Sequence, residues 1–198
     1  MAVPGAAWPF DDRTALVVVD MQNDFADRRG SLYVDGGEQV TEQVNRLVRE
    51  ARAAGATVVY TQDWHPHDTP HFVDGGGVWP RHCVQGSWGA QLVDGLAVDG
   101  PVVQKGTGGE DGYSGFSMRD PETGRVQHTA LDGMLRERGI RRVVVVGLAQ
   151  DVCVKETALD ARRLGYATAV VTGATRPVEP AKGARALAEL REAGVELA

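Results

Sequence analysis

Ala15-Leu16-Val17-Val18-Val19-Asp20 is a continuous apolar run that ends in a carboxylate. A strand with one face in water alternates apolar and polar residues, whereas a strand buried on both faces is apolar throughout. The run therefore predicts a buried strand over Ala15–Val19, of the kind found in parallel sheets. Because Asp20 follows directly, a charged group stands at the carboxyl end of this strand.

Further apolar segments alternate with amphipathic stretches along the chain. In the first such stretch, Val40, Val44 and Val48 recur at helical spacing, and Gly55 follows as a stop signal. This alternation predicts an α/β fold: a single-domain, doubly wound, mostly parallel six-stranded sheet with helices on both faces. The predicted strands are Ala15–Val19, Thr57–Thr61, Val102–Gln104, Arg142–Val146, Ala167–Thr172 and Val195–Leu197, and the predicted helices are Glu38–Ala54, Cys153–Leu164 and Pro180–Ala193.

Composition narrows the class of protein. With 198 residues, 42% of them hydrophobic, the chain is long enough for one substantial core, and we expect one domain over residues 1–198. The net charge of -6 is spread along the chain, so no basic stripe favours nucleic-acid binding. No apolar run is long enough to span a membrane and no export signal precedes residue 14, which predicts a cytoplasmic protein. The oligomeric state stays open, a homo-oligomer included.

Histidines are concentrated in one part of the chain. Four of the five lie between Val59 and Val84. Histidine is a poor core residue, and neighbouring protonated imidazoles repel one another, so packing alone does not explain this clustering. A carboxylate and two or three neutral imidazoles would form a mixed oxygen and nitrogen site for one divalent metal ion. The candidate ligands are Asp63, His65, His71 and His82.

Polar residues also stand at the carboxyl ends of successive predicted strands. Asp20 ends the first strand, Asp63 and His65 follow the second, Lys105 follows the third, and Cys153 lies a few residues beyond the fourth. In an open doubly wound sheet these ends form one edge, where ligands bind. We therefore expect residues more than a hundred positions apart to converge on one pocket.

The chemistry of this set is that of a cysteine hydrolase. Cys153 follows a strand-to-helix loop, so we expect the helix N-terminus and the Lys105 ammonium to lower the pKa of its thiol. Asp20 could then carry the proton from the thiol to a leaving amine. Burial as a small core residue is the competing interpretation of Cys153.

Five motifs, taken together and in order, resemble a known family. They are V-V-V-D-M-Q-N-D-F at Val17–Phe25, D-x-H-x5-H-F from Asp63, W-P-x-H-C-V at Trp79–Val84, Q-K-G followed by Y-S-G-F, and G-L-A-x-D-x-C-V at Gly147–Val154. Over nearly its whole length the chain resembles the nicotinamidase/pyrazinamidases of the isochorismatase-like cysteine hydrolases. The combination is far more specific than any single motif.

The resemblance implies roles for individual residues. The catalytic triad would be Asp20, Lys105 and Cys153. The backbone N–H groups of Ala149 and Cys153 would form the oxyanion hole, with a cis peptide bond between Leu148 and Ala149. The metal ligands would be Asp63, His65, His71 and His82, and the aromatic slot for a pyridine ring would be lined by Phe25, Trp79 and Tyr113.

The activity implied is hydrolysis of nicotinamide, and of pyrazinamide, to the acid and ammonia through a thioester, in NAD salvage. The cofactor would be one divalent metal ion, zinc first, with iron and manganese as alternatives. The nearest alternative is a related amidase of the same family that acts on another carboxamide or carbamoyl group. A non-catalytic metal-binding or pyridine-binding protein and a zinc-hydroxide hydrolase are further alternatives. Isochorismatases proper cleave a vinyl ether without this metal cluster.

Other polar residues near these motifs have structural explanations. Asp24 and Asp151 suit turns or helix caps. Cys83 is expected to be buried beside the site, and His67 to be a neighbour of the metal ligands rather than one of them. His128 precedes a predicted helix and should face solvent.

Overall fold

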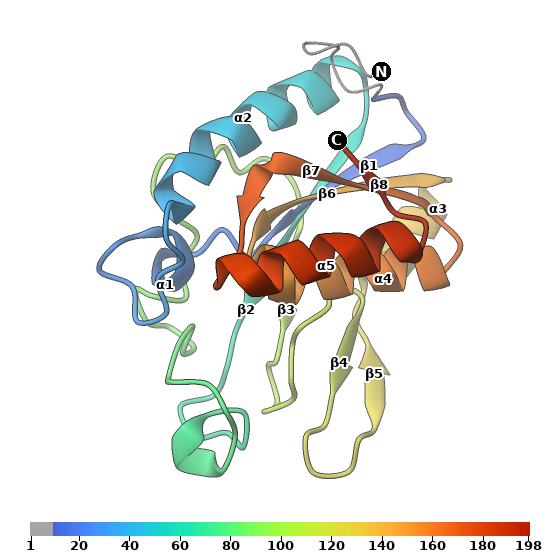
Figure 1. Cartoon of the computed structure of the whole chain (residues 1–198). Coiled ribbons are helices and arrows are strands. Elements are labelled where there is room, and N and C mark those ends of the chain that lie inside the picture. Colours follow the sequence, from blue (N-terminus) through green and yellow to red (C-terminus); the bar gives the residue numbers. More distant parts are fainter. Residues whose placement is uncertain (1–9) are drawn as a thin grey trace.

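The computed structural model describes residues 10–198, and a six-stranded sheet forms its centre (Figure 1). Every pair of neighbouring strands in this sheet is parallel, which confirms the predicted doubly wound α/β architecture. The predicted domain of residues 1–198 includes residues 1–9, which lie outside the described residues. The strands are β1 (Thr14–Val19), β2 (Thr57–Asp63), β3 (Val102–Lys105), β6 (Arg142–Leu148), β7 (Ala167–Arg176) and β8 (Glu196–Leu197), in the spatial order β3-β2-β1-β6-β7-β8.

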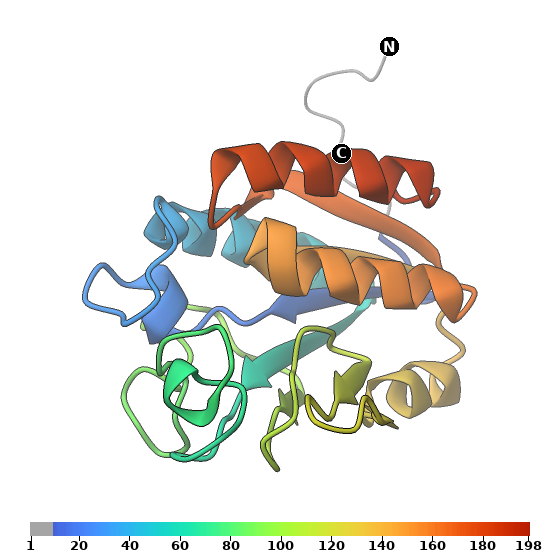
Figure 2. The same cartoon turned by 60° about the horizontal axis from the view of Figure 1, so that its bottom comes forward.

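Helices cover both faces of the sheet because its central strands are apolar on both faces. Along β1, Leu16 and Val18 pack under α2 (Gly37–Ala53), while Val17 and Val19 pack against the opposite layer. Figures 1 and 2 show α2 on one side of the sheet and α4 and α5 together on the other. The second layer consists of α3 (Leu131–Glu137), α4 (Lys155–Arg163) and α5 (Pro180–Glu192).

The order of the strands reverses between β1 and β6, which are neighbours in space although more than a hundred residues separate them. The loops that leave their carboxyl ends diverge, and this divergence opens a crevice at that edge of the sheet. The loop that holds the short helix η1 (Val73–Gly75) and the hairpin of β4 (Ser117–Arg119) and β5 (Val126–His128) extends beyond the same edge (Figure 1). A further short helix, α1 (Asn23–Ala26), follows β1.

The structure differs from the sequence expectation in several elements. Strands β2 and β6 each end two residues later than predicted, and the short helix α1 was not predicted. The helix predicted to begin at Cys153 begins earlier, with a π-helical turn, η2 (Gln150–Val154), which continues into α4. Strand β7 runs on to Arg176, past the predicted end at Thr172, with a register shift against β6. The β4–β5 hairpin was not predicted, because its strands are three residues long and largely exposed and so carry no alternating apolar pattern.

Within residues 10–198, no helix combines the length and the apolar content that crossing a membrane requires.

Candidate active site

Lys105 lies at the centre of a buried polar cluster at the carboxyl edge of the sheet. Its Nζ is 2.7 Å from Asp20 Oδ2 and 3.8 Å from Cys153 Sγ. The same ammonium group contacts the Asp63 carboxylate and donates to the carbonyl oxygen of Gly112. Asp20, Asp63 and Cys153 each offer an atom within 4.8 Å of the others. The structure therefore brings together Asp20, Lys105 and Cys153, as the strand-end argument predicted.

The two carboxylates of this cluster, Asp20 and Asp63, differ in the direction in which their pKa values are shifted. Burial lowers the pKa of Lys105, but Asp20 and Asp63 outweigh burial and hold that pKa well above its usual value. Burial raises the pKa of Asp20 against the opposing effect of Lys105. Burial also disfavours ionised Asp63, yet Lys105 and the neighbouring imidazoles keep the pKa of Asp63 low. Asp63 is therefore the fixed negative charge, and Asp20 is the carboxylate better suited to gain and lose a proton.

The thiol of Cys153 does not have the lowered pKa that the sequence suggested. Burial raises the pKa of the Cys153 thiol, and the Lys105 ammonium offsets only part of that effect. The carboxylates of Asp20 and Asp63 raise it further. The expectation was wrong because it counted the helix terminus and the lysine but not the two buried carboxylates beside the sulfur. Burial and the two carboxylates thus favour the neutral thiol over the thiolate at Cys153.

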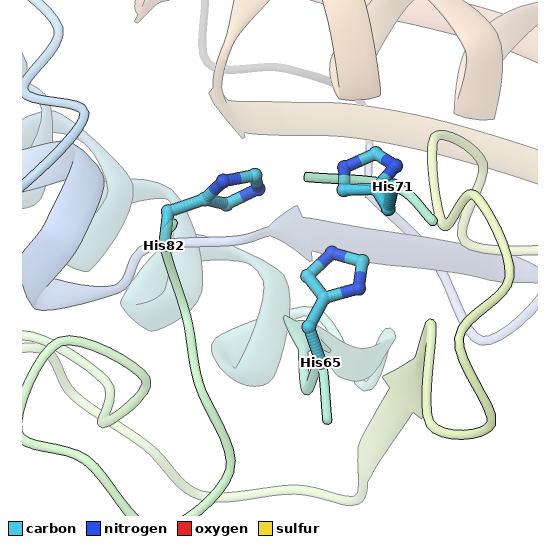
Figure 3. Close-up of side chains that lie close together, drawn as sticks. All are labelled: His65, His71 and His82. Atoms are coloured by element: carbon cyan, nitrogen blue, oxygen red, sulfur yellow. The ribbon is translucent and has the colours of Figure 1, made fainter. Parts of the chain in front are cut away.

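Three imidazoles face one another beside this cluster (Figure 3). His65, His71 and His82 are buried, and each offers a ring nitrogen within 4.8 Å of the other two. The rings of His65 and His71 stack with centroids 4.4 Å apart. Asp63 Oδ2 lies 3.7 Å from His65 Nε2 and 3.9 Å from His82 Nε2. The four predicted ligands therefore surround one small space.

The residues around this space fit a bound metal ion. Neither ring nitrogen of His65 has a hydrogen-bond partner among the residues that the structure describes, an arrangement that is costly unless something else binds there. Burial lowers the pKa of His71 and lowers that of His82 to about 4, so these rings are neutral, as metal ligation requires. Neutral imidazole nitrogens with one carboxylate oxygen are donors that zinc and similar divalent ions prefer. His67, by contrast, points away: its side chain is 74% exposed beside Asp68.

A small cavity opens onto both groups of residues. Trp79 and Tyr113 form part of its wall, and the indole N–H of Trp79 donates to the Tyr113 hydroxyl at 2.9 Å. Phe25 stands on the cavity wall against His82, with ring centroids 5.5 Å apart. Of the predicted site residues, those that line the cavity are Phe25, Asp63, His71, Trp79, His82, Tyr113, Ala149 and Cys153.

Four aliphatic residues of the cavity wall were not predicted from the sequence. Leu32 and Val34 follow α1, Val152 lies in the π-helical turn, and Val178 follows β7. Leu32, Val34 and Val178 lie in segments that carry no recognisable motif, and Val152 occupies a variable position of the G-L-A-x-D-x-C-V motif. Sequence alone does not distinguish these four from other apolar residues. Asp111, which contacts His71, was missed for the same reason.

The remaining polar residues have structural partners. Asp24 accepts hydrogen bonds from the backbone N–H groups of Cys83, at 2.7 Å, and Ser31, at 3.0 Å. Cys83 is buried, as expected, with a positive φ of 46°. Asp151 accepts from the N–H of Val178 at 2.8 Å. His128 is exposed on β5, and the peptide bond between Leu148 and Ala149 is cis, as the resemblance implied.

Comparison with known proteins identifies the family. Residues 14–198 match the isochorismatase domain. The chain is 42% identical to the nicotinamidase/pyrazinamidase of Mycobacterium tuberculosis, with 92% of this chain and 97% of the relative covered. It is 34% identical to a ureidoacrylate amidohydrolase, RutB, of Methylorubrum extorquens, with 85% and 72% covered.

Solved structures agree with these sequence matches. The pyrazinamidase of Pyrococcus horikoshii, crystallised in complex with zinc, superposes with a TM-score of 0.84 at 37% identity, over 94% of this chain and 98% of that one. PnC1 of L. infantum, solved in complex with nicotinate, gives a TM-score of 0.88 at 39% identity, over 98% of this chain and 96% of that one. Because the domain match spans almost the whole chain and the fold agrees with these structures, the chain belongs to the isochorismatase family.

Proposed function

We propose that this protein is a metal-dependent cysteine amidohydrolase that converts nicotinamide, and also pyrazinamide, to the corresponding acid and ammonia. The observation that carries the proposal is the shared cavity: a thiol, a histidine-rich cluster and three aromatic rings open onto the same small volume. Relatives named as nicotinamidase/pyrazinamidase, at 42% identity, support the choice of substrate.

The cavity suits a small flat heteroaromatic amide. Phe25, Trp79 and Tyr113 supply ring surfaces, which favour an aromatic substrate over an aliphatic one. Asp63 and three imidazoles at one end would hold a divalent ion, of which zinc is our first choice. When bound, that ion would supply an electrophilic open position for a ring nitrogen of the substrate. Cys153 and Ala149 line the same cavity, where the carboxamide would lie.

The residues of the chain account for the chemistry. Asp20 takes the proton of the Cys153 thiol, and the sulfur attacks the carboxamide carbon. The N–H groups of Ala149 and Cys153 stabilise the oxyanion. Asp20 returns the proton to the leaving nitrogen, so that ammonia departs and a thioester forms. Water then hydrolyses the thioester, releasing the acid and restoring the thiol.

Lys105 acts throughout as a fixed positive charge. Asp20, Asp63 and the Gly112 carbonyl all contact its ammonium group, and its raised pKa keeps it protonated. Its positive charge offsets the negative charge of the two carboxylates and favours the ionised form of Asp20, the form that can accept a proton. Because the ammonium group already donates to these three partners, Lys105 is not the residue that transfers the proton.

Ammonia release from nicotinamide tests the proposal. The purified protein should release one ammonia per nicotinate formed, and Cys153→Ala should lower kcat by at least about 10⁴-fold, the scale of losing the nucleophile of a catalytic triad. Cys83→Ala is the matched control, since Cys83 is buried outside the cavity lining and should leave turnover nearly unchanged. Appreciable activity in Cys153→Ala would point to a hydrolase that uses a metal-bound nucleophile.

A second candidate is a related amidase for another substrate. The match to a ureidoacrylate amidohydrolase at 34% identity is the observation that favours it. Ureidoacrylate is a linear acid with a carbamoyl group, so it would gain little from three aromatic walls. Comparing kcat/KM for nicotinamide, pyrazinamide and ureidoacrylate distinguishes the two, and a higher value for ureidoacrylate would reverse our assignment.

A further inference from the structure

Asp111 contacts the metal-ligand cluster, although neither its spacing nor any motif distinguishes it. It lies in the Gly-rich segment between β3 and β4, and its Oδ1 accepts a hydrogen bond from Nδ1 of His71 at 2.5 Å. The carboxylate is largely shielded, with 20% of the Asp111 side chain exposed, and the His71 side chain is 3% exposed. A short, mostly buried contact between a carboxylate and an imidazole is strong and directional.

The contact determines which nitrogen of His71 remains available. With Nδ1 donating to Asp111, the second ring nitrogen, Nε2, is the one left to act as a ligand. His82 is arranged in the same way, because its Nδ1 lies 2.7 Å from the carbonyl oxygen of Pro80. In Figure 3 the rings of His71 and His82 turn toward the space above His65.

The backbone of Asp111 is itself fixed. Its N–H donates to the carbonyl of Arg119 at 2.7 Å, and the N–H of Arg119 donates back to Asp111 at 2.9 Å. These two bonds attach Asp111 to β4 and therefore to the hairpin. A second hydrogen bond joins the Gly-rich segment to the loop that carries His71, since the Thr69 hydroxyl donates to the carbonyl of Gly109 at 2.9 Å. The backbone that carries the carboxylate is thus held in place independently of the contact with His71.

We propose that Asp111 is a positioning residue that holds the ring of His71 and presents Nε2 to the metal ion. The inference rests on the proposed function in one respect, the presence of a metal site at Asp63, His65, His71 and His82. A carboxylate on the far nitrogen also increases the electron density of the imidazole, which strengthens the bond to a cation. Asp111 would therefore raise metal affinity without contacting the metal or the substrate.

Metal affinity measured without turnover tests this role. In chelator competition with Zn²⁺, Asp111→Ala should raise the dissociation constant by about 10–100-fold, the range typical of a lost outer partner of a ligating histidine. Asp111→Asn keeps an oxygen that can accept from Nδ1 but removes the charge, so it should fall between wild type and Asp111→Ala. If Asp111→Ala does not fold, the Asn variant carries the test alone, and an unchanged dissociation constant for it would overturn the proposal.

Glu110→Gln is the matched control. It removes one negative charge from the adjacent residue while keeping an oxygen for the N–H of Gly108. Its dissociation constant should stay close to that of wild type. Equal weakening in Glu110→Gln and Asp111→Ala would mean that general loss of negative charge, rather than contact with His71, controls the affinity.

A double-mutant cycle with His71 separates positioning from a general structural role. Once His71→Ala has removed the ring, adding Asp111→Ala should change the Zn²⁺ dissociation constant by no more than about twofold, because coupled residues are not additive. The same loss in both backgrounds would contradict action through His71. In the Co²⁺ form, Asp111→Asn should shift the visible absorption bands while Glu110→Gln should not, and an unshifted spectrum would count against the proposal.

Zn²⁺ binding by the wild-type protein tests the metal site separately from the role of Asp111. Wild-type protein that binds Zn²⁺ with about one ion per chain, together with an unaffected Asp111→Ala, would refute the positioning role and leave the proposed function intact. Wild-type protein that binds no Zn²⁺ would refute both.

Discussion

At the scale of single residues, Lys105 is a cation that two negative groups share. Its side chain is fully buried, and it contacts the carboxylates of Asp20 and Asp63. Removing one member of a buried ion pair leaves an uncompensated charge, which costs far more than the pair contributes. The lysine therefore contributes to the stability of this edge of the sheet, in addition to its proposed part in the chemistry.

Lys105→Met should therefore lose both stability and activity. The buried carboxylates lose their shared partner, and we expect the free energy of unfolding to fall by about 3–5 kcal/mol. Urea denaturation measures the stability, and ammonia release measures the activity. Lys182→Met is the control, since that exposed lysine pairs with Glu179 on the surface and should change neither. A Lys105→Met protein as stable as Lys182→Met would contradict the assigned electrostatics.

The sequence predicted that the candidate residues converge, but not the environment in which they do so. Asp20, Asp63 and Lys105 end apolar strands, and strand ends of a parallel sheet meet at one edge, so their convergence followed from topology. The pKa of Cys153 did not, because it depends on how deeply the sulfur is buried and on two carboxylates from other strands. Asp111 also escaped prediction, since its contact with His71 depends on the loop conformation alone.

At the scale of elements, the Gly-rich segment after β3 packs directly against His65 and Asp63, two of the proposed metal ligands. Gly106 has a φ of 72°, and a Cβ at that position would lie 2.5 Å from Cε1 of His65. Further along the segment, Gly112 approaches Asp63 closely, because a Cβ on Gly112 would lie 3.1 Å from Asp63 Oδ1. Glycine is therefore required here both for the backbone conformation and for the close approach.

Gly106→Ala should displace His65 and weaken metal retention. A residue with a side chain is strained at this φ and collides with a buried ring, so we expect a loss of stability of more than about 1 kcal/mol. The bound metal per chain after dialysis and the unfolding midpoint are the measurements. Gly133→Ala in α3 is the matched control, because its Cβ would meet open space and should stabilise the helix by roughly 0.5–1 kcal/mol. Effects of the same sign in both variants would rule out the steric explanation.

Strands were predicted correctly where burial on both faces makes their sequences apolar throughout. Strands β1, β2 and β6 are apolar because both their faces are covered, and their positions were close to those predicted. The exposed hairpin β4–β5 has no such pattern, and the π-helical turn at Gln150–Val154 depends on backbone geometry that side-chain periodicity does not report.

At the scale of the whole molecule, a bound ion would attach the long loop after β2 to the end of that strand. Asp63 ends β2, whereas His71 and His82 come from the long loop that follows. An ion that binds the folded protein and not the unfolded chain stabilises the fold by mass action.

Metal removal should accordingly lower the unfolding temperature. At about 100 times its dissociation constant, Zn²⁺ should stabilise by about 2.7 kcal/mol, which for a chain of this size raises the unfolding temperature by roughly 5–10 °C. Thermal denaturation of chelator-treated protein with and without Zn²⁺ measures the shift. His67→Ala should retain it, because that side chain is exposed, whereas His71→Ala should reduce it. An equal shift in both variants would remove His71 from the proposed ligand set.

The strand order also has a consequence for biosynthesis. Strand β1 is completely buried and lies between β2 and β6. Because β6 begins only at Arg142, one edge of β1 stays unpaired during synthesis until most of the chain has been made. Cys153 and Val178 emerge later still, and no shorter nascent fragment can enclose the pocket. Newly made chains therefore pass through an interval in which an unpaired apolar strand is exposed, the condition under which incomplete chains are prone to aggregate.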